Sequence, residues 1–319
     1  NGEHDNVLAK KFAVVISQFI TGEASNTVDT QTDVSKDTTP EMAYVMENMK
    51  PGYYLVENTA VPDTVESSFD ANAVYTPGSG EGAYTRYILW ATGDTMTVEE
   101  KRSVPEVMKK VWEDTNTITG TAGIGTFTET DEEWNDVADY NIGEKVPFKL
   151  YGTMPSTLED YEHYYYKFTD TIADSFTIED PANWVIKVWN GDTGTEVANN
   201  FYNIHKEKTN NGLTVTIEDI KSLKDTAGNT ITVDDKSVIT VEYKAELNNK
   251  AVIGVNSQIN EVSLTYSNNP NVEYKPFTDG PKDDTENDAN EETDTTPEAP
   301  DDDDTGDTPK DTVIVFTYQ

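Results

Sequence analysis

The chain has 319 residues, a formal net charge of −37 and no cysteine. This length predicts about two domains, each large enough for its own core. The acid excess argues against nucleic acid and anionic membrane surfaces as partners, because phosphate groups are bound through clusters of lysine and arginine. Disulfides and thiolate metal sites are excluded, and no apolar run has the length of a membrane span or the form of a signal peptide.

The first part of the chain, about 1–103, is predicted to be a small mixed α/β domain. The apolar residues of 6–20 recur at helical spacing, with Asp5 as the N-cap and Gly22 at the end. A polar loop follows over 23–39. Strand-like segments then occupy 42–49, 53–58 and 85–93.

The second part, about 104–319, is predicted to be an immunoglobulin-like β-sandwich, because short strands alternate with turns at close spacing. The pattern breaks at 276–311, where 283–307 holds 13 acidic residues and no lysine or arginine. Such a stretch cannot bury enough apolar surface to offset its ordering entropy, so we expect a removable acidic loop inserted before a last strand at 312–318. Weak calcium binding by D-D-D-D is the alternative, although the spacing of an EF-hand loop is missing.

Three polar residues occupy the same alternate positions as the apolar side chains of strand-like segments. They are Lys109 in P-E-V-M-K-K-V, Asp170 in Y-Y-K-F-T-D-T-I and Asn260 in I-N-E-V-S-L-T-Y. Because successive side chains of a strand point to opposite faces, each polar group should project into the core. The sequence therefore predicts an amine, a carboxyl group and a carboxamide in one dry interior.

Buried charges persist only when they are paired, neutralised or chemically consumed. Burial favours the neutral forms of amines and carboxylic acids, so a neutral Lys109 could attack the side-chain carbonyl of Asn260. Asp170 would polarise that carbonyl and transfer protons, and the product would be an isopeptide bond and one ammonia. A buried Lys–Asp ion pair beside a hydrogen-bonded asparagine is the simpler alternative.

Five sequence blocks resemble the isopeptide-forming domain of Gram-positive sortase-assembled pilins. They occur in the order of that family and cover about 105–275, at 105–111, 141–155, 166–172, 238–253 and 260–271. The resemblance implies that Lys109 and Asn260 form the intramolecular bond and that Asp170 assists it in a single turnover, so the protein is not an enzyme in the ordinary sense. No cofactor or metal is implied.

The same resemblance implies a structural subunit of an extracellular pilus or fibrillar adhesin, anchored to the cell wall. Its partners would be neighbouring pilin subunits joined by sortase, with a host surface ligand as a further partner and no membrane contact in this fragment. The N-terminal segment resembles the second half of the pilins' first domain, whose opening strands would precede residue 1. Lys101 lies roughly where pilins carry the lysine for linkage between subunits.

Neighbouring polar residues are predicted to lie outside this site. Lys110 has the opposite parity to Lys109, and Lys149 should face solvent between two inward residues. Glu242 and Glu246 should be solvated acids. Asn268 shares the parity of Asn260 but falls in the turn-forming S-N-N-P, which favours a loop.

Two other functional classes remain. A glycan-binding or host-binding adhesin would use an aromatic platform, with Tyr161 and Tyr165 outside while Tyr164 and Tyr166 pack inside; Trp184 and Trp189 belong to the same aromatic cluster. A secreted glycoside hydrolase would use paired acids, which arise readily in so acidic a chain. His4, His163 and His205 lack the spacing of metal ligands and are predicted to be surface residues.

Overall fold

The computed structural model describes most of the C-terminal two thirds of the chain and shorter stretches elsewhere. The described residues are 43–47, 51–57, 65–66, 79–80, 83–84, 86–91, 95–99, 103–113, 119–122, 125–128, 133–199, 203–270, 272, 274–276 and 299–318. The predicted helix at 6–20, the loop at 23–39, His4 and Lys101 lie outside them.

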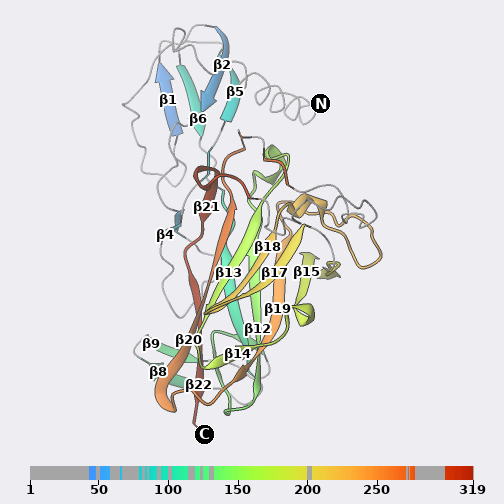
Figure 1. Cartoon of the computed structure of the whole chain (residues 1–319). Coiled ribbons are helices and arrows are strands. Elements are labelled where there is room, and N and C mark those ends of the chain that lie inside the picture. Colours follow the sequence, from blue (N-terminus) through green and yellow to red (C-terminus); the bar gives the residue numbers. More distant parts are fainter. Residues whose placement is uncertain are drawn as a thin grey trace.

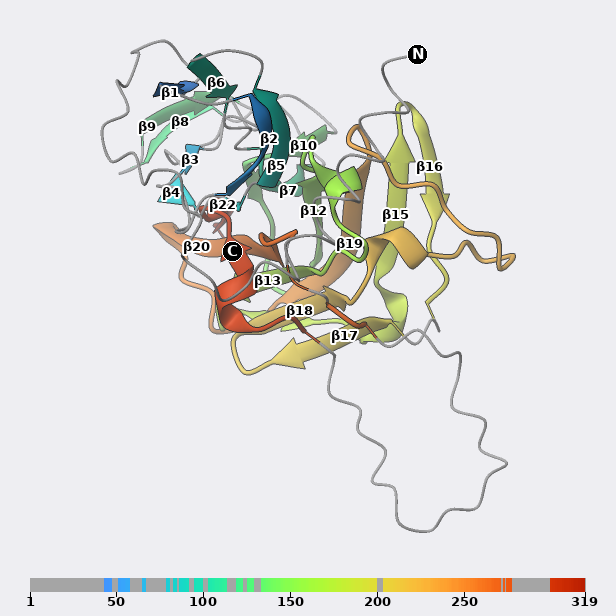
Figure 2. The same cartoon turned by 90° about the horizontal axis from the view of Figure 1, so that it is seen from above.

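Two seven-stranded sheets form the body of the protein and face each other as a sandwich (Figure 1, Figure 2). The first sheet has the order β10 (Glu133–Asn135), β7 (Val107–Glu113), β12 (Lys145–Thr153), β19 (Val238–Leu247), β15 (Val185–Asn190) and β16 (Thr193–Glu196), with β14 (Phe176–Ile178) also paired to β19. The second has the order β11 (Val137–Asp139), β22 (Asp311–Thr317), β20 (Gly254–Ser267), β13 (Tyr166–Ile172), β18 (Gly212–Ile217) and β17 (Ile204–Thr209), with β21 (Thr305–Asp307) paired to β20. The predicted β-sandwich is therefore confirmed.

The alternation of side chains along the strands explains the two layers. In β7 and β13 every second residue is buried, as expected for strands with one face on a core. The core between the sheets is rich in aromatic and branched residues, among them Phe148, Tyr166, Phe168 and Trp184. Burial of this apolar surface is the main favourable term in the folding of the sandwich.

Short turns set the register of neighbouring strands. Strands β15 and β16 pair through Asn190 and Thr193, which leaves a two-residue loop. Gly191 in that loop has φ of 59°, a conformation that costs glycine nothing and that hairpin turns require. The segment W-N-G-D-T-G therefore forms a tight hairpin.

The remaining elements are short. Described strands before residue 103 pair only with one another: β1 (Ala43–Glu47) with β6 (Thr95–Glu99), β2 (Gly52–Glu57) with β5 (Arg86–Ala91), and β3 (Val65–Glu66) with β4 (Ser79–Gly80). Strands β8 (Thr119–Ala122) and β9 (Gly125–Thr128) form a separate hairpin. The described helices are single 3₁₀ turns: η2 (Leu158–Asp160), η3 (Pro181–Asn183), η4 (Ile220–Ser222) and η5 (Asp302–Asp304).

The end of the acidic run, 299–307, does not behave as a free loop, and this corrects the sequence prediction for that part of 283–307; residues 283–298 lie outside the described residues. Part of D-D-D-D forms η5, and β21 pairs with β20 directly after it. The main-chain carbonyl of Asp304 accepts a hydrogen bond from the Asn268 amide at 3.0 Å, and Gly306 packs against the Tyr266 ring. Main-chain pairing does not depend on side-chain charge, so an acidic segment can join a sheet edge while its carboxylates stay in water. The predicted last strand is confirmed as β22.

Candidate functional site: a buried lysine, aspartate and asparagine

Lys109, Asp170 and Asn260 all lie in the interior of the sandwich, as their strand parity predicts. Their relative exposures are 0%, 2% and 0%. Strand β7 of one sheet carries Lys109, whereas the adjacent strands β13 and β20 of the facing sheet carry the other two. Asp170 pairs with Val262 and Ile172 pairs with Asn260, so the carboxyl group and the carboxamide are diagonal neighbours on one face.

The Lys109 ammonium group bridges the two sheets. Its Nζ donates to Asp170 Oδ1 at 2.5 Å and to the Tyr243 hydroxyl at 3.2 Å. The Tyr243 hydroxyl in turn donates to Asp170 Oδ2 at 2.7 Å. Each carboxylate oxygen of Asp170 therefore has its own partner, and the three groups form a closed hydrogen-bonded ring.

Sheet register explains why Tyr243 reaches this ring. Lys109 pairs with Leu150 across β7 and β12, and Tyr243 pairs with Phe148 across β12 and β19. The lysine and the tyrosine thus lie on the same face of one sheet, on either side of β12. Nζ lies 4.9 Å from the centre of the Phe148 ring and 5.8 Å from that of Tyr243, within the range of cation–π contacts.

Burial dominates the electrostatics of the amine. Desolvation lowers the pKa of Lys109 below its usual value of 10.5, and the charges of Asp170, Asp311 and Glu261 oppose that shift. Burial raises the pKa of the Tyr243 hydroxyl well above its usual value, and the charge of Asp170 raises it further. The tyrosine therefore keeps its proton and remains a donor to Asp170. At Lys109 the neutral form of the amine is more favoured than it is in an exposed lysine.

The Asn260 carboxamide is held from one side only. Its Oδ1 accepts a hydrogen bond from the Ala173 main-chain amide at 2.9 Å. Its Nδ2 is buried and has no hydrogen-bond partner among the described residues. Because the Ala173 amide can only donate, it also fixes which end of the carboxamide carries the oxygen.

The main chain of Lys109 is anchored as well. Its amide donates to Asp311 Oδ2 at 2.6 Å, and Asp311 is the first residue of β22 in the facing sheet. This hydrogen bond connects β7 to β22 across the two sheets. It restricts the backbone from which the amine extends.

The sequence predicted the lysine, aspartate and asparagine but missed Tyr243, Ala173 and Asp311. Tyr243 shares the inward parity of Val241 and Ala245, so its burial could be predicted although its partners could not. The site contains an amine with a lowered pKa that is hydrogen-bonded to a carboxylate, and a carboxamide on the adjacent strand that is hydrogen-bonded to a main-chain amide. These are the components of amine attack on an amide carbonyl.

Lys149 corrects the prediction of a solvent-facing side chain. It points away from the core, as its parity requires, yet its side chain is only 10% exposed. Nζ lies 5.1 to 5.4 Å from the ring centres of Trp134, Tyr151 and Trp189, and 3.0 Å from Glu242 Oε1. Aromatic side chains from β10, from β15 and from β12 itself cover this lysine, and the period of one strand does not reveal the contribution of the other two. Lys110 also lies on this face and pairs with Asp136.

The aromatic platform predicted around Tyr161 and Tyr165 is not an exposed surface. Both residues are 5% exposed, as buried as their neighbours, and Trp184 is fully buried. Tyr161 packs edge-on against Tyr164 with ring centres 4.8 Å apart, and Tyr165 packs against Tyr274. Residues 161–165 precede β13, so strand alternation does not apply to them.

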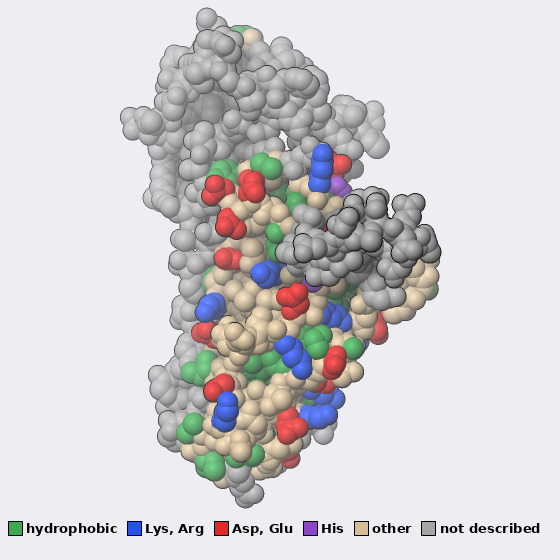
Figure 3. All heavy atoms as spheres, viewed as in Figure 1, with side chains coloured by type: hydrophobic (Ala, Val, Ile, Leu, Met, Phe, Trp, Pro, Cys, Tyr) green, Lys and Arg blue, Asp and Glu red, His purple; other side chains and the backbone are tan. Residues whose placement is uncertain are grey.

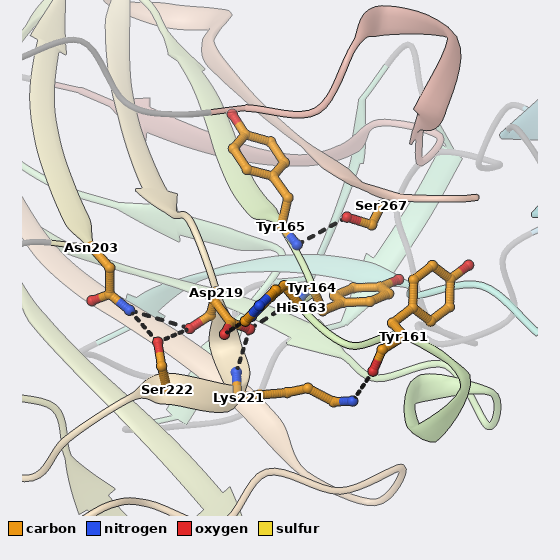
Figure 4. Close-up of polar contacts among 9 residues, drawn as sticks. All are labelled: Tyr161, His163, Tyr164, Tyr165, Asn203, Asp219, Lys221, Ser222 and Ser267. Carbon is orange, nitrogen blue, oxygen red and sulfur yellow. Dashed lines mark hydrogen bonds and ion pairs between the residues drawn. The ribbon is translucent and has the colours of Figure 1, made fainter. Parts of the chain in front are cut away.

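Figure 4 shows the polar contacts that fix this segment. Asp219 Oδ1 accepts hydrogen bonds from the amides of Tyr164 and Lys221, and its Oδ2 lies 2.9 Å from His163 Nδ1. The Lys221 ammonium group donates to the Tyr161 carbonyl. The cluster is a structural junction between two loops.

His163 and His205 are less exposed than predicted. The side chain of His163 is 27% exposed and that of His205 is 20% exposed, and His205 Nε2 lies 2.7 Å from Glu218 Oε1.

Acidic and basic side chains are interspersed over the sandwich face in Figure 3. The described residues contain no cluster of histidine and acidic side chains suited to a metal ion. No helix in the described part of the chain has the length and apolar character needed to span a bilayer.

Comparison with solved structures finds similarity to bacterial pilins. The major pilin of Streptococcus agalactiae, a C-terminal fragment, is 21% identical with a TM-score of 0.34, over 56% of this chain and 54% of that chain. A backbone pilin of Streptococcus pyogenes is 17% identical with a TM-score of 0.40, over 86% of this chain and 46% of that chain. The major pilin subunit of Bacillus cereus is 12% identical with a TM-score of 0.41, over 73% of this chain and 50% of that chain. The chain thus matches about half the length of these structures. No family model and no curated protein matches the sequence.

Proposed function

We propose that this chain is a structural subunit of a Gram-positive surface pilus or fibrillar adhesin, stabilised by a self-generated bond between Lys109 and Asn260. The proposal combines the ordered sequence blocks at 105–275 with the geometry of the buried site. It places the protein outside the cell, attached to the wall, with neighbouring subunits joined by sortase as its partners. Lys101 is the proposed linkage lysine.

One observation carries the proposal. A fully buried lysine with a lowered pKa donates to a buried aspartate, and a fully buried asparagine, whose Nδ2 has no hydrogen-bond partner in the described part of the chain, lies on the strand next to that aspartate. Burying an ion pair costs desolvation free energy that well-packed apolar residues would avoid. A covalent product that removes both charges would explain why polar groups occupy these three core positions.

The chemistry balances without any further reactant. Asp170 takes a proton from Nζ, and the neutral amine attacks Cγ of Asn260. The Nζ–Cγ bond forms and the Cγ–Nδ2 bond breaks, while one amine proton is relayed by Asp170 to Nδ2, which leaves as ammonia. Each molecule reacts once, so the protein is not a turnover enzyme.

The proposed role of the bond is mechanical. It would tie β7, the first strand of the sandwich, to β20 in the opposite sheet. Force applied along the chain could not then separate the two sheets by peeling off β7. This property suits a fibre under tension on a cell surface.

Intact mass and peptide mapping test the proposal. The purified chain should be lighter than its sequence mass by one ammonia, and a tryptic digest should contain a branched peptide carrying Lys109 and Asn260. A matched Lys110→Ala variant should show the same deficit, because that side chain lies on the other face of β7. A parent mass without any deficit would exclude the bond.

A further inference from the structure

The main-chain amide of Ala173 forms a hydrogen bond with the carbonyl oxygen of Asn260. Its N–H donates to Oδ1 at 2.9 Å. Ala173 follows directly after β13, where the pairing with β20 ends at Ile172 and Asn260. If the pairing of β13 with β20 continued, a main-chain carbonyl of β20 would accept the Ala173 N–H. Here the side-chain oxygen of Asn260 accepts it instead.

Asp170 is occupied elsewhere. Its Oδ1 accepts from the Lys109 ammonium group and its Oδ2 accepts from the Tyr243 hydroxyl. Both oxygens therefore face the amine and the tyrosine. In this arrangement Asp170 is placed to move protons at Nζ, and polarisation of the Asn260 carbonyl needs a different donor.

Attack by Nζ on Cγ places negative charge on Oδ1 in the tetrahedral intermediate. A neutral hydrogen bond from the Ala173 N–H then becomes a hydrogen bond to an anion, which is shorter and stronger. Asn260 is completely buried, so water does not compete for that oxygen. A donor already in place costs no reorganisation when the charge develops.

We propose that the Ala173 main-chain N–H is a catalytic group that stabilises the oxyanion of Asn260, while Asp170 serves proton transfer. The inference rests on the proposed function. It also explains the orientation of the carboxamide. The hydrogen bond from Ala173 holds Oδ1, whereas Nδ2 forms no hydrogen bond with the described residues, so none of these has to break before ammonia leaves.

The local turn supports this assignment. The Ala173 carbonyl accepts from the Phe176 amide at 3.0 Å, and the Asp174 carbonyl accepts from Asn248 Nδ2 at 3.2 Å. The Ile172 amide donates to the Asn211 carbonyl. These contacts hold the Ala173 N–H in place independently of the asparagine that it touches.

The test removes this single N–H and measures the rate of ammonia loss. The full chain is synthesised in a cell-free reaction, samples are quenched in acid over time, and intact mass gives the reacted fraction. Ala173→Pro should slow bond formation about 10²- to 10³-fold, the usual effect of losing one oxyanion donor. Asp174→Pro is the matched control and should react at the parent rate, because proline suits the second position of a turn.

A second variant covers the case in which proline disturbs the fold. Lactic acid incorporated in place of Ala173 replaces the N–H by an ester oxygen and keeps the methyl side chain. It should slow the reaction to a similar extent. If the parent loses ammonia and this ester analogue does so at the parent rate, the role of Ala173 is refuted while the bond itself stands. If the parent loses no ammonia, the proposed function fails instead.

Discussion

Replacing Lys109 tests whether the covalent tie holds the sandwich together. The tie would close a loop from 109 to 260, about 150 residues, and chain entropy gives about 5 kcal/mol for a loop of this length. A shift of about 2 to 4 °C per kcal/mol for a domain of this size then predicts a melting temperature about 10 to 20 °C lower in Lys109→Ala. The variant should also become sensitive to trypsin across the sandwich, while the N-terminal part changes little.

Two matched variants separate the tie from packing. Lys109→Ala also leaves a cavity, whereas Lys109→Met fills much of the space with an unbranched apolar chain that cannot react. Lys110→Arg changes a lysine on the other face but keeps a cation beside Asp136, and it should melt close to the parent. Differential scanning calorimetry with intact mass of each sample provides the measurement. If the parent and Lys109→Met melt together, the tie does not stabilise this module, even where the mass shows that it has formed.

Three further substitutions, one of them followed over pH, and two deletions test other parts of the proposal. Asp170→Asn keeps the shape but cannot accept a proton, so the fold should persist and the ammonia loss should disappear by intact mass. Asn260→Ala leaves Lys109 unlinked with a folded-state pKa below its unfolded value of 10.5. Between these two pKa values the unfolded state binds more protons, so urea unfolding should show stability that rises with pH, and a fall would contradict the lowered pKa. Tyr243→Phe removes a hydrogen bond to a charged group and should slow bond formation about tenfold or more in a quenched time course; an unchanged rate would make the tyrosine a packing residue only. Deleting 283–298 should leave the melting temperature nearly unchanged, because so acidic a segment has little apolar surface to bury. A deletion that includes β21 should lower the melting temperature, because that strand pairs with β20. A calcium-dependent rise in melting temperature, lost in the shorter deletion, would instead indicate a metal site.

The strand pattern predicted the fold and the interior position of Lys109, Asp170 and Asn260. Alternation is a local property: whichever strand lies beside β13, a residue in phase with Phe168 must face the same way. Asp170 could therefore be assigned to the core from eight residues of sequence. The prediction for Asn260 was equally local, because β20 is long and regular around it.

Predictions failed where the local period does not apply or where other strands decide the outcome. Tyr161 and Tyr165 precede the strand, so alternation said nothing reliable about their direction. Lys149 points outward as expected but is covered by rings from β10, β12 and β15. Asp304 lies in an acidic run whose composition predicts solvation, yet its main-chain carbonyl accepts a hydrogen bond from the amide of Asn268, directly after β20.

The chemical roles in the site depend on contacts that no single segment contains. Tyr243 reaches Asp170 only because β12 separates β7 from β19 by one strand, and because the facing sheet places β13 opposite them. Tyr243 donates to Oδ2 of Asp170 and Lys109 donates to Oδ1, whereas the Asn260 carbonyl accepts from the Ala173 amide. The strand pattern could identify the proposed reacting groups, whereas the hydrogen bonds from which their separate roles are proposed depend on sheet order. Residues such as Tyr243 are therefore best sought at inward positions two strands away from the nucleophile.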